Sequence, residues 1–157
     1  MPQVIFPGGT GGGGGSGSSS TDVYRVFTLG EDCVAGDVVR PASSLDAPIV
    51  NGQAVKAKAT NDYESDAIGV VLQSGVAGTQ VRVIILGSQS LTFSVAPLIS
   101  QTGSDVYLDS NNAGQVTLTA PSGSGRSVVR IGKILFADGV QTSVPCLIDI
   151  DFILGYA

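Results

Sequence analysis

The sequence contains no histidine and no tryptophan, and it has one methionine and two cysteines among 157 residues. Histidine is the commonest general base in enzymes and the commonest side-chain ligand of metal ions. Without it, a nucleophilic serine would need a lysine as its base. Lys56, Lys58 and Lys133 all lie in strand-like stretches with no Gly-x-Ser-x-Gly motif nearby. We therefore expect no catalytic residues, and a protein that is not an enzyme and needs no cofactor.

The two cysteines, Cys33 and Cys146, are too few for a zinc site and lack Cys-x-x-Cys spacing. They lie at comparable edges of two similar stretches, so a disulfide between them fits the sequence. Two buried free thiols that pack as small apolar side chains fit it as well. Of the two arrangements, we predict the free thiols.

Charged residues are scarce, at 13% of the chain, while 43% of the residues are hydrophobic and the net charge is −5. Lys and Arg are scattered, so no basic patch is predicted and nucleic-acid binding is not expected. No apolar run approaches the about 20 residues that a membrane helix needs. The first seven residues lack the basic segment and long apolar segment of a signal peptide. We expect a protein made and used in a cytoplasm, or assembled there into something later released, with no membrane partner and with much of its surface covered by another molecule.

Residues 1–21 differ from the rest of the chain. Three consecutive apolar residues, Val4, Ile5 and Phe6, are followed by a Gly/Ser tract over residues 8–20. Such a tract has high backbone entropy and is flexible in isolation. It can be a tail without a role or an extended arm held by a partner. We predict the arm, with Val4, Ile5 and Phe6 as an apolar hook that binds the partner.

From residue 22 onward, short runs of β-branched and aromatic residues alternate with turn residues every 8–12 positions or so. Apolar residues nowhere recur at helical spacing over three turns. The pattern predicts an all-β domain over 22–157, a small β-barrel or sandwich with almost no helix. Asn51-Gly52 also predicts a hairpin turn. The predicted strands are 24–29, 38–40, 54–59, 67–72, 81–86, 91–95, 106–108, 116–119, 130–135 and 144–150.

An Ile-Gly pattern occurs twice, at Ile68-Gly69 and at Ile131-Gly132. In both places an Asp-Val lead-in and a short strand come before it, and a turn and a longer strand come after it. The two copies are offset by about 65 residues, which suggests two related β-modules inside one domain. We place these halves at about 22–90 and 91–157.

Two groups of polar residues need an interpretation. Asp149 and Asp151 alternate with apolar residues, so their carboxylates lie on one face of a strand, as in glycosidases and calcium sites. The polar outer side of an amphipathic strand explains them equally, and we prefer it. The loop 109–112 lacks the glycine and glutamate of an EF-hand, and ordinary turn chemistry accounts for its Asp and Asn. No metal is expected.

Three segments together resemble the capsid cement, or head decoration, proteins of tailed phages. They are Ala-Gly-Asp-Val-Val at 35–39, Ala-Ile-Gly-Val-Val-Leu at 67–72 and Gly-Thr-Gln-Val-Arg-Val at 78–83. The second half, 103–151, with Asp-Val-Tyr-Leu at 105–108 and Arg-Ile-Gly-Lys-Ile-Leu at 130–135, is similar to modules of phage head fibres and other virion surface proteins. The resemblance covers most of the chain beyond residue 30, and the Gly/Ser arm departs from the shortest members of the family.

The resemblance implies a structural role on the virion. Members of the family have no active site, lie on the outer capsid surface, commonly as homotrimers, and bridge major capsid protein subunits. The expected location is the capsid surface after assembly in the host cytoplasm, and the arm can dock on the capsid or on a sister subunit. The alternatives are a head-fibre or tail-fibre receptor-binding module, which should group exposed aromatics on loops, and a glycan-active enzyme that uses carboxylates.

Overall fold

The computed structural model describes residues 22–155, which contain nine β-strands, two single-turn 3-10 helices and no α-helix. The expectation of an all-β fold with almost no helix is confirmed. The strands are β1 (Val23–Thr28), β2 (Val38–Pro41), β3 (Ala54–Lys56), β4 (Gly69–Val71), β5 (Gln80–Thr92), β6 (Asp105–Leu108), β7 (Val116–Thr117), β8 (Ser127–Ile134) and β9 (Ser143–Gly155), and the 3-10 turns are η1 (Ser44–Asp46) and η2 (Ile99–Gln101).

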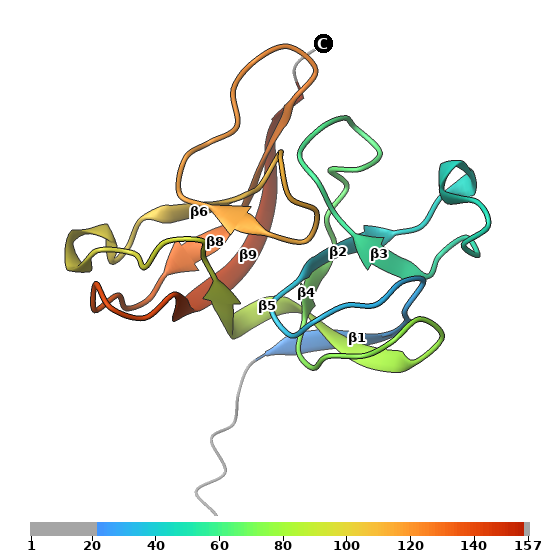
Figure 1. Ribbon diagram of the computed structural model, residues 1–157, viewed down its shortest axis with the longest axis horizontal. Coiled ribbons are helices and arrows are strands. Elements are labelled where there is room, and N and C mark those ends of the chain that lie inside the picture. The colour runs from blue at the N-terminus through green and yellow to red at the C-terminus, as the bar shows by residue number, and fades with distance from the viewer. Residues whose placement is uncertain (1–21, 156–157) are drawn as a thin grey trace, which may run out of the picture.

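All nine strands belong to one antiparallel sheet, which curls into a half-barrel (Figure 1). The order along the sheet is β3-β2-β4-β5-β9-β8-β6-β7, and β1 pairs with the outer edge of β5. Ile84 of β5 pairs with Tyr24 of β1 and with Val70 of β4, so these two strands lie on opposite edges of β5. Leu86 pairs with β1 and β9 in the same way.

The two halves of the sheet repeat one strand order. In the first half the order is β3-β2-β4-β5, and in the second it is β7-β6-β8-β9. The two long strands meet in the middle, where β5 and β9 pair from Leu86↔Asp149 to Thr92↔Ser143. The predicted boundary between residues 90 and 91 therefore falls inside β5.

The glycine of each Ile-Gly pattern lies at the same place in its half. A Cβ at Gly69 of β4 would collide with the carbonyl oxygen of Ile84 on β5, and a Cβ at Gly132 of β8 would collide with that of Leu147 on β9. The glycines are 63 residues apart (69 and 132), as are the two carbonyls (84 and 147). Glycine is required at both places because the neighbouring backbone approaches too closely for any side chain.

The core has two clusters. The larger one joins the halves, with Val38, Val70 and Ile84 from the first and residues such as Ile131 and Ile148 from the second. The smaller one lies within the first half and consists of Leu29, Cys33, Val39, Ala54, Val71, Val81 and Val83. Both faces of β4 are therefore buried, which explains why its sequence is continuously apolar.

A loop of the second half is hydrogen-bonded to the backbone of the first. In the β6–β7 loop, the Gly114 carbonyl accepts from Val38 N at 2.9 Å, and Gly114 N donates to the Ala57 carbonyl at 2.7 Å. Ala59 N also donates to the Asp109 carbonyl at 3.0 Å. The halves are thus joined at two places, through the β5–β9 pairing and through this loop.

Two local predictions were wrong. Strands 81–86 and 91–95 were expected to be separate, but β5 runs on through Gly87. Gly87 adopts a φ of +140°, beside Asp22, whose carboxylate accepts from Ser88 N at 3.2 Å. A glycine backbone can adopt this angle and continue the strand, so the expected break is only an irregularity.

The Asn51-Gly52 turn is present, with a φ of +84° at Gly52, but no strand precedes it. β3 pairs instead with β2, and η1 occupies part of the connection between them. η1 is held by a capping box: the Ser43 side chain accepts a hydrogen bond from the backbone of the turn, and the Asp46 side chain accepts one from the backbone of Ser43. This local bonding keeps the residues that precede the Asn51-Gly52 turn out of the sheet.

The cysteines are free and buried, as predicted. Cys33 belongs to the smaller core cluster and Cys146 to the larger one. Burial raises the pKa of each thiol to about 12, and for Cys33 the nearby carboxylates of Asp37 and Glu31 act in the same direction. Both thiols therefore pack as neutral, weakly polar side chains.

Candidate functional site: an apolar tip and its polar surroundings

One end of the molecule carries exposed hydrophobic side chains on two neighbouring loops. The loops are 93–104, between β5 and β6, and 135–142, between β8 and β9, at the left of Figure 1. Phe93 is buried in the core, but the other large apolar side chains of these loops are between 48% exposed, for Leu135, and 81% exposed, for Val140. We call this set the apolar tip: Val95, Leu98, Ile99, Leu135, Phe136 and Val140.

Hydrogen bonds hold the two loops of the apolar tip together. Gly139 N donates to the Pro97 carbonyl at 3.1 Å, and Phe93 N donates to the Thr142 carbonyl at 2.9 Å. Ala137 N donates to the Thr102 hydroxyl at 3.1 Å. Because these bonds fix the loops before any partner binds, the apolar side chains are presented at a reduced entropic cost of association.

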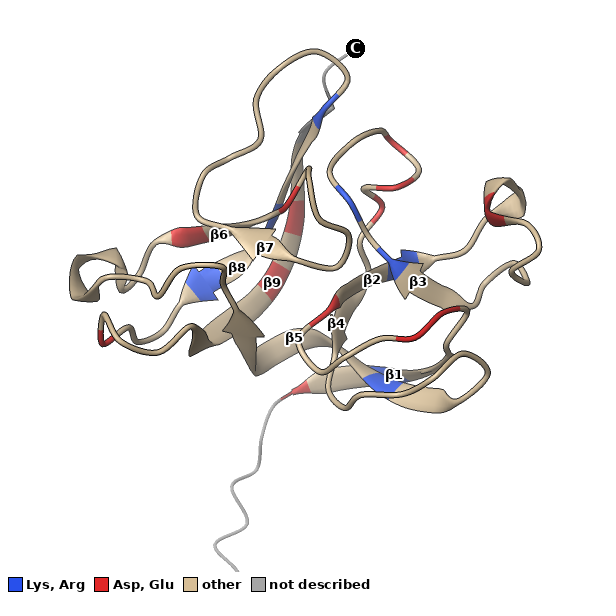
Figure 2. Ribbon diagram, in the orientation of Figure 1, with Lys and Arg blue, Asp and Glu red and all other residues tan. Residues whose placement is uncertain are grey.

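The two loops that carry the apolar tip contain a single charged residue, Asp138 (Figure 2). Its Oδ1 accepts from Gln141 N at 2.8 Å and from Val140 N at 2.9 Å, and these bonds lower the pKa of the carboxyl group. The charge is thus used to shape its own turn. Isolated exposed hydrophobic residues are ordinary, but six on two joined loops are typical of an interaction surface.

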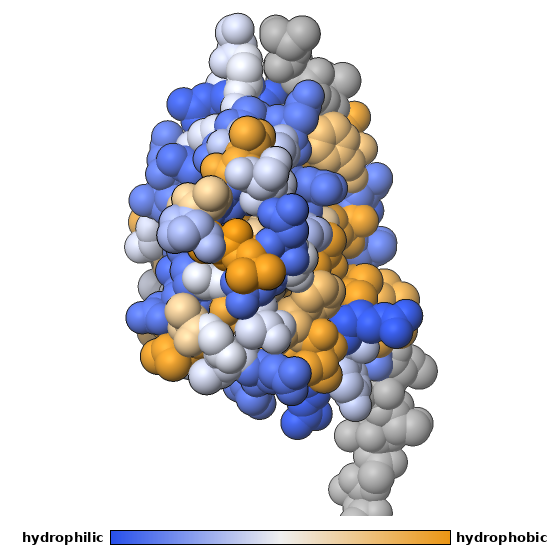
Figure 3. All heavy atoms as spheres, turned by 90° about the vertical axis from the view of Figure 1, so that its right-hand side faces the viewer, coloured by the Kyte–Doolittle hydropathy of each residue, from blue (hydrophilic) through white to orange (hydrophobic). Residues whose placement is uncertain are grey.

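The opposite end of the molecule is different. Figure 3 faces the first half, where hydrophilic side chains cover most of the left of the view with separate hydrophobic ones among them, and a hydrophobic group lies along the right-hand border. Leu45 on η1 and Val50 are exposed there, on the connection between β2 and β3. These exposed residues form no group comparable with the tip.

The outer face of the second half is polar and paired. Asp149 and Asp151 lie on one face of β9, as predicted, and both approach Arg130 Nη2, at 3.6 and 3.8 Å. Lys133 Nζ lies 2.8 Å from Asp105 Oδ1. Each of these carboxylates has a cationic neighbour, which fits the interpretation of a charged strand surface better than that of an acid–base pair.

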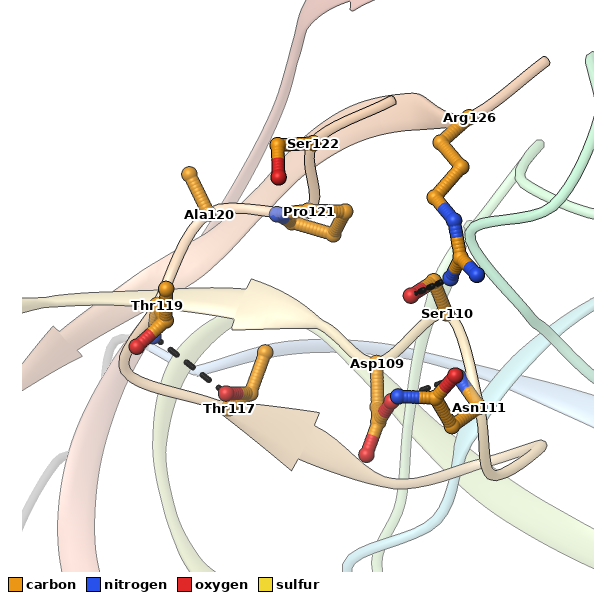
Figure 4. Close-up of a pocket in the computed structure, with 9 residues that line it drawn as sticks. All are labelled: Asp109, Ser110, Asn111, Thr117, Thr119, Ala120, Pro121, Ser122 and Arg126. Carbon is orange, nitrogen blue, oxygen red and sulfur yellow. Dashed lines mark hydrogen bonds between the residues drawn. The ribbon is translucent and has the colours of Figure 1, made fainter. Parts of the chain in front are cut away.

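A shallow, open pocket of about 310 Å³ lies between the β6–β7 loop and the chain that leads into β8 (Figure 4). Asp109 Oδ1 accepts from Asn111 N at 2.6 Å, and Arg126 donates to the Ser110 hydroxyl. These groups are polar but already bonded to one another, as expected for a loop built by turn chemistry. The pocket is lined by Asp109, Ser110, Asn111, Thr117, Thr119, Ala120, Pro121, Ser122 and Arg126.

Two of the three lysines considered as catalytic bases have acidic neighbours instead. Lys133 is paired with Asp105, and Lys56 Nζ lies 3.8 Å from Asp37 Oδ2. Asp37 is buried and also accepts from Val34 N at 2.9 Å, and burial raises the pKa of its carboxyl group. This pair belongs to the junction between the halves, because Gly114 of the β6–β7 loop packs beside Asp37.

The predicted partner-binding residues, Val4, Ile5 and Phe6, lie outside the described residues. The structure instead shows the apolar tip, which sequence reasoning missed. A signal was present: Leu98, Ile99, Phe136 and Val140 are large apolar residues near Pro97 or Gly139 and lie outside the predicted strands. Their sequence pattern alone does not separate a partner surface from a core loop.

Over residues 22–155 no group of three or more Cys, Asp or Glu side chains is placed to hold a metal ion. Within the same range, no helix is long and apolar enough to cross a membrane. No protein-family model matches the chain, and no curated protein matches it in sequence.

Proposed function

We propose that this chain is a non-enzymatic virion structural protein that decorates the outer surface of a tailed-phage capsid and bridges neighbouring major capsid protein subunits. The observation that carries the proposal is the apolar tip, an uncharged surface apart from Asp138, presented on two fixed loops. The resemblance of the segments at 35–39, 67–72 and 78–83 to capsid cement proteins gives the partner its identity.

Apolar contact suits a cementing role. Each Å² of apolar surface removed from water contributes about 25 cal/mol, and a shell repeats the same contact many times. A surface with almost no charge also binds with little dependence on salt, because few ion pairs are screened. The summed effect stabilises a shell without any single strong site.

The proposal includes two further contacts. The hook residues Val4, Ile5 and Phe6 provide a second attachment to the major capsid protein, and copies of the chain associate with one another on the capsid surface. The resemblance implies a homotrimer for that association. Assembly takes place in the host cytoplasm, and the finished protein remains on the virion.

The test is the occupancy of undecorated shells assembled from the major capsid protein of the same phage. Val140→Asp places a charge on the most exposed side chain of the tip. Because that side chain is exposed, the free energy of unfolding should change by less than about 0.5 kcal/mol. We expect shell occupancy to fall at least tenfold, equivalent to about 1.4 kcal/mol per site.

The matched control is Val50→Asp, the same substitution on an exposed valine at the opposite end. We expect this variant to decorate shells as well as the unmodified protein does. Equal occupancy for both variants and the unmodified chain would exclude the tip as the capsid contact. Failure of the unmodified chain to bind shells at all would overturn the proposed function.

The alternative is a head-fibre or tail-fibre receptor-binding module, and the polar pocket of Figure 4 is what favours it. Hydroxyl groups, a carboxylate and a guanidinium can bind the hydroxyls of a surface glycan. The pocket has no aromatic residue in its lining, and Tyr24, Tyr63 and Tyr107 lie on separate elements. If the purified protein blocks phage adsorption to cells and Arg126→Ala removes that effect, the alternative holds.

A further inference from the structure

β1 is an edge strand with one edge unpaired. Its residues pair with β5, from Val23↔Leu86 to Thr28↔Gln80, and no described strand pairs with its other edge. Its side chains are nevertheless large and exposed, at 45% for Val23, 49% for Tyr24 and 58% for Val26. In Figure 3, hydrophobic side chains gather along the right-hand border of the view.

Natural sheets normally protect such an edge. Lysine or inward-pointing charges, proline, a bulge or a covering loop prevents another strand from adding to it. The sequence of β1, Val-Tyr-Arg-Val-Phe-Thr, contains no proline, lysine or acidic residue. The one irregularity in its pairing falls at its start, between Val23 and Tyr24, and leaves 24–28 regular. An unprotected edge of this kind is a template for a further strand.

We propose that β1 pairs, antiparallel and about a two-fold axis, with β1 of a second copy of this chain. Such an axis stands perpendicular to the sheet and leaves each side chain on its own face. Residues opposite one another must also share a face, so the two residue numbers of each pair must sum to an even number. The axis therefore passes beside one residue, which lies directly opposite the same residue of the second copy.

Charge decides which residue lies on the axis. With Arg25 there, two guanidinium groups would lie directly opposite one another, which is destabilising. With Tyr24 there, only residues 23–25 would pair. With Val26 on the axis, residues 24–28 all pair, and Arg25 lies opposite Phe27 of the partner subunit. This is the register that we propose.

The contacts in this register are chemically matched. Val26 meets Val26 of the partner subunit, a close β-branched pair, and Tyr24 lies opposite Thr28 of the partner subunit. The Arg25 guanidinium can lie over the partner's Phe27 ring. Within its own chain Tyr24 already has the Arg82 guanidinium over its ring, 5.4 Å from the centroid, so this side chain is held for contact.

The paired surface is small. Two strands of this length bury less than the about 1,200 Å² of a stable interface, so we expect a weak dimer that forms at high concentration. On a surface where many copies lie side by side, the effective concentration is high and a weak pair is populated. The inference rests on the edge of β1 alone and does not depend on the proposed function.

The first test is register-specific crosslinking of the full chain. Val26→Cys places two thiols directly across the axis, and oxidation should give a covalent dimer. The matched variant is Tyr24→Cys, also exposed, whose thiols would lie four positions apart, about 13 Å, and should not crosslink. The unmodified chain is the background, because Cys33 and Cys146 are buried. No dimer with Val26→Cys, or an equal yield with Tyr24→Cys, overturns the proposal.

The second test is sedimentation equilibrium over a wide concentration range. The unmodified chain should show a concentration-dependent monomer–dimer equilibrium. Val26→Lys should raise its dissociation constant at least tenfold, because two ammonium groups would meet on the axis. Val26→Thr keeps the branched shape and should change the dissociation constant of the dimer by less than about threefold. Denaturant unfolding checks that both variants are folded. If the unmodified chain shows no such equilibrium, or Val26→Lys leaves it unchanged, β1 is not a self-pairing edge.

Discussion

The guanidinium of Arg40 binds the carboxylate of Asp46 through two nitrogens, with Nη2–Oδ1 at 2.6 Å and Nη1–Oδ2 at 2.8 Å. Both side chains are largely buried, at 6% and 13% exposed. Ser43 N also donates to Asp46 Oδ2 at 2.8 Å, so one carboxylate joins β2 to η1 and caps the turn. The loop between β2 and β3 is therefore held by charge and not by an apolar core, since η1 has no buried residue.

Asp46→Asn should lower the free energy of unfolding at pH 7 by about 3 kcal/mol, because it leaves Arg40 as a buried charge without its partner. The Arg40 hydrogen bonds hold the pKa of the Asp46 carboxyl below its ordinary value near 4. Its contribution to stability is therefore complete above pH 4 and is lost as the pH falls through the folded-state pKa. Denaturant unfolding between pH 7 and pH 2 measures this, and the variant should show a shallower acid loss. An unchanged stability would mean that the pair contributes nothing net.

Asp37→Asn should behave in the opposite way. Burial raises the pKa of the Asp37 carboxyl group. Its contribution to stability is therefore fully present at a pH below its ordinary pKa and is lost as the pH rises through the folded-state pKa. Asparagine keeps an acceptor for Val34 N and removes the buried charge. At pH 7 we expect equal or higher stability, by up to about 1 kcal/mol, measured by the same unfolding curves. A loss as large as that of Asp46→Asn would contradict this account.

The thiols should be unreactive in the native protein. With a pKa of about 12, Cys33 and Cys146 have very little thiolate at pH 8, and both are buried. A chromogenic disulfide reagent should titrate close to zero thiols in the native chain and two after denaturation. Rapid native labelling of either cysteine would show that its core cluster opens more easily than the structure indicates.

Gly132→Ala should cost at least about 3 kcal/mol or prevent folding, because the methyl group would collide with the Leu147 carbonyl and separate β8 from β9. Gly123→Ala is the control. Gly123 has a φ of +108° but no neighbouring atom within 4 Å, so it should cost only the about 1–2 kcal/mol of a left-handed residue. Chemical denaturation measures the loss of free energy of unfolding in each variant. Similar losses would mean that backbone conformation, and not the close approach of β9, explains the glycine at position 132.

Deletion of residues 1–20 should leave the fold unchanged and lower shell occupancy at least tenfold, about 1.4 kcal/mol per site. The reason is the hook at Val4, Ile5 and Phe6, whose contacts must offset an ordering cost of about 1–2 kcal/mol per residue of the Gly/Ser tract. Occupancy on undecorated shells is the measurement. If the truncated chain decorates as well as the full one, residues 1–20 are a tail without a binding role.

Local patterns in the sequence were enough to predict most of the strands. Runs bounded by turn residues predicted β1, β2, β4, β6 and β8, and the glycine of each Ile-Gly pattern lies where β4 closely approaches β5 or β8 closely approaches β9. Strand identity depends on nearest neighbours along the chain, which a sequence states directly. The expected break at Gly87 failed because that glycine's role depends on Asp22, which is far away in sequence.

The candidate surfaces could not be found in the same way. Val95 and Val140 read as ordinary apolar residues until the 93–104 and 135–142 loops are placed beside one another. Likewise, β1 becomes an open edge only because β4 and β9 occupy the other side of β5. Exposure is set by which distant segments pair, and short patterns contain no such information.

The position of β9 has a consequence for how the chain matures during translation. It is the last strand of the described chain to be synthesised, yet it lies in the middle of the sheet, between β5 and β8. A nascent chain that has emerged only as far as β8 has a gap where the two halves should join. Sheets that depend on such distant pairings fold slowly. Ser143–Gly155 must therefore emerge from the ribosome before the sheet can close, and until then the facing edges of β5 and β8 are unpaired. Unpaired strand edges of this kind make a partly folded chain prone to aggregate.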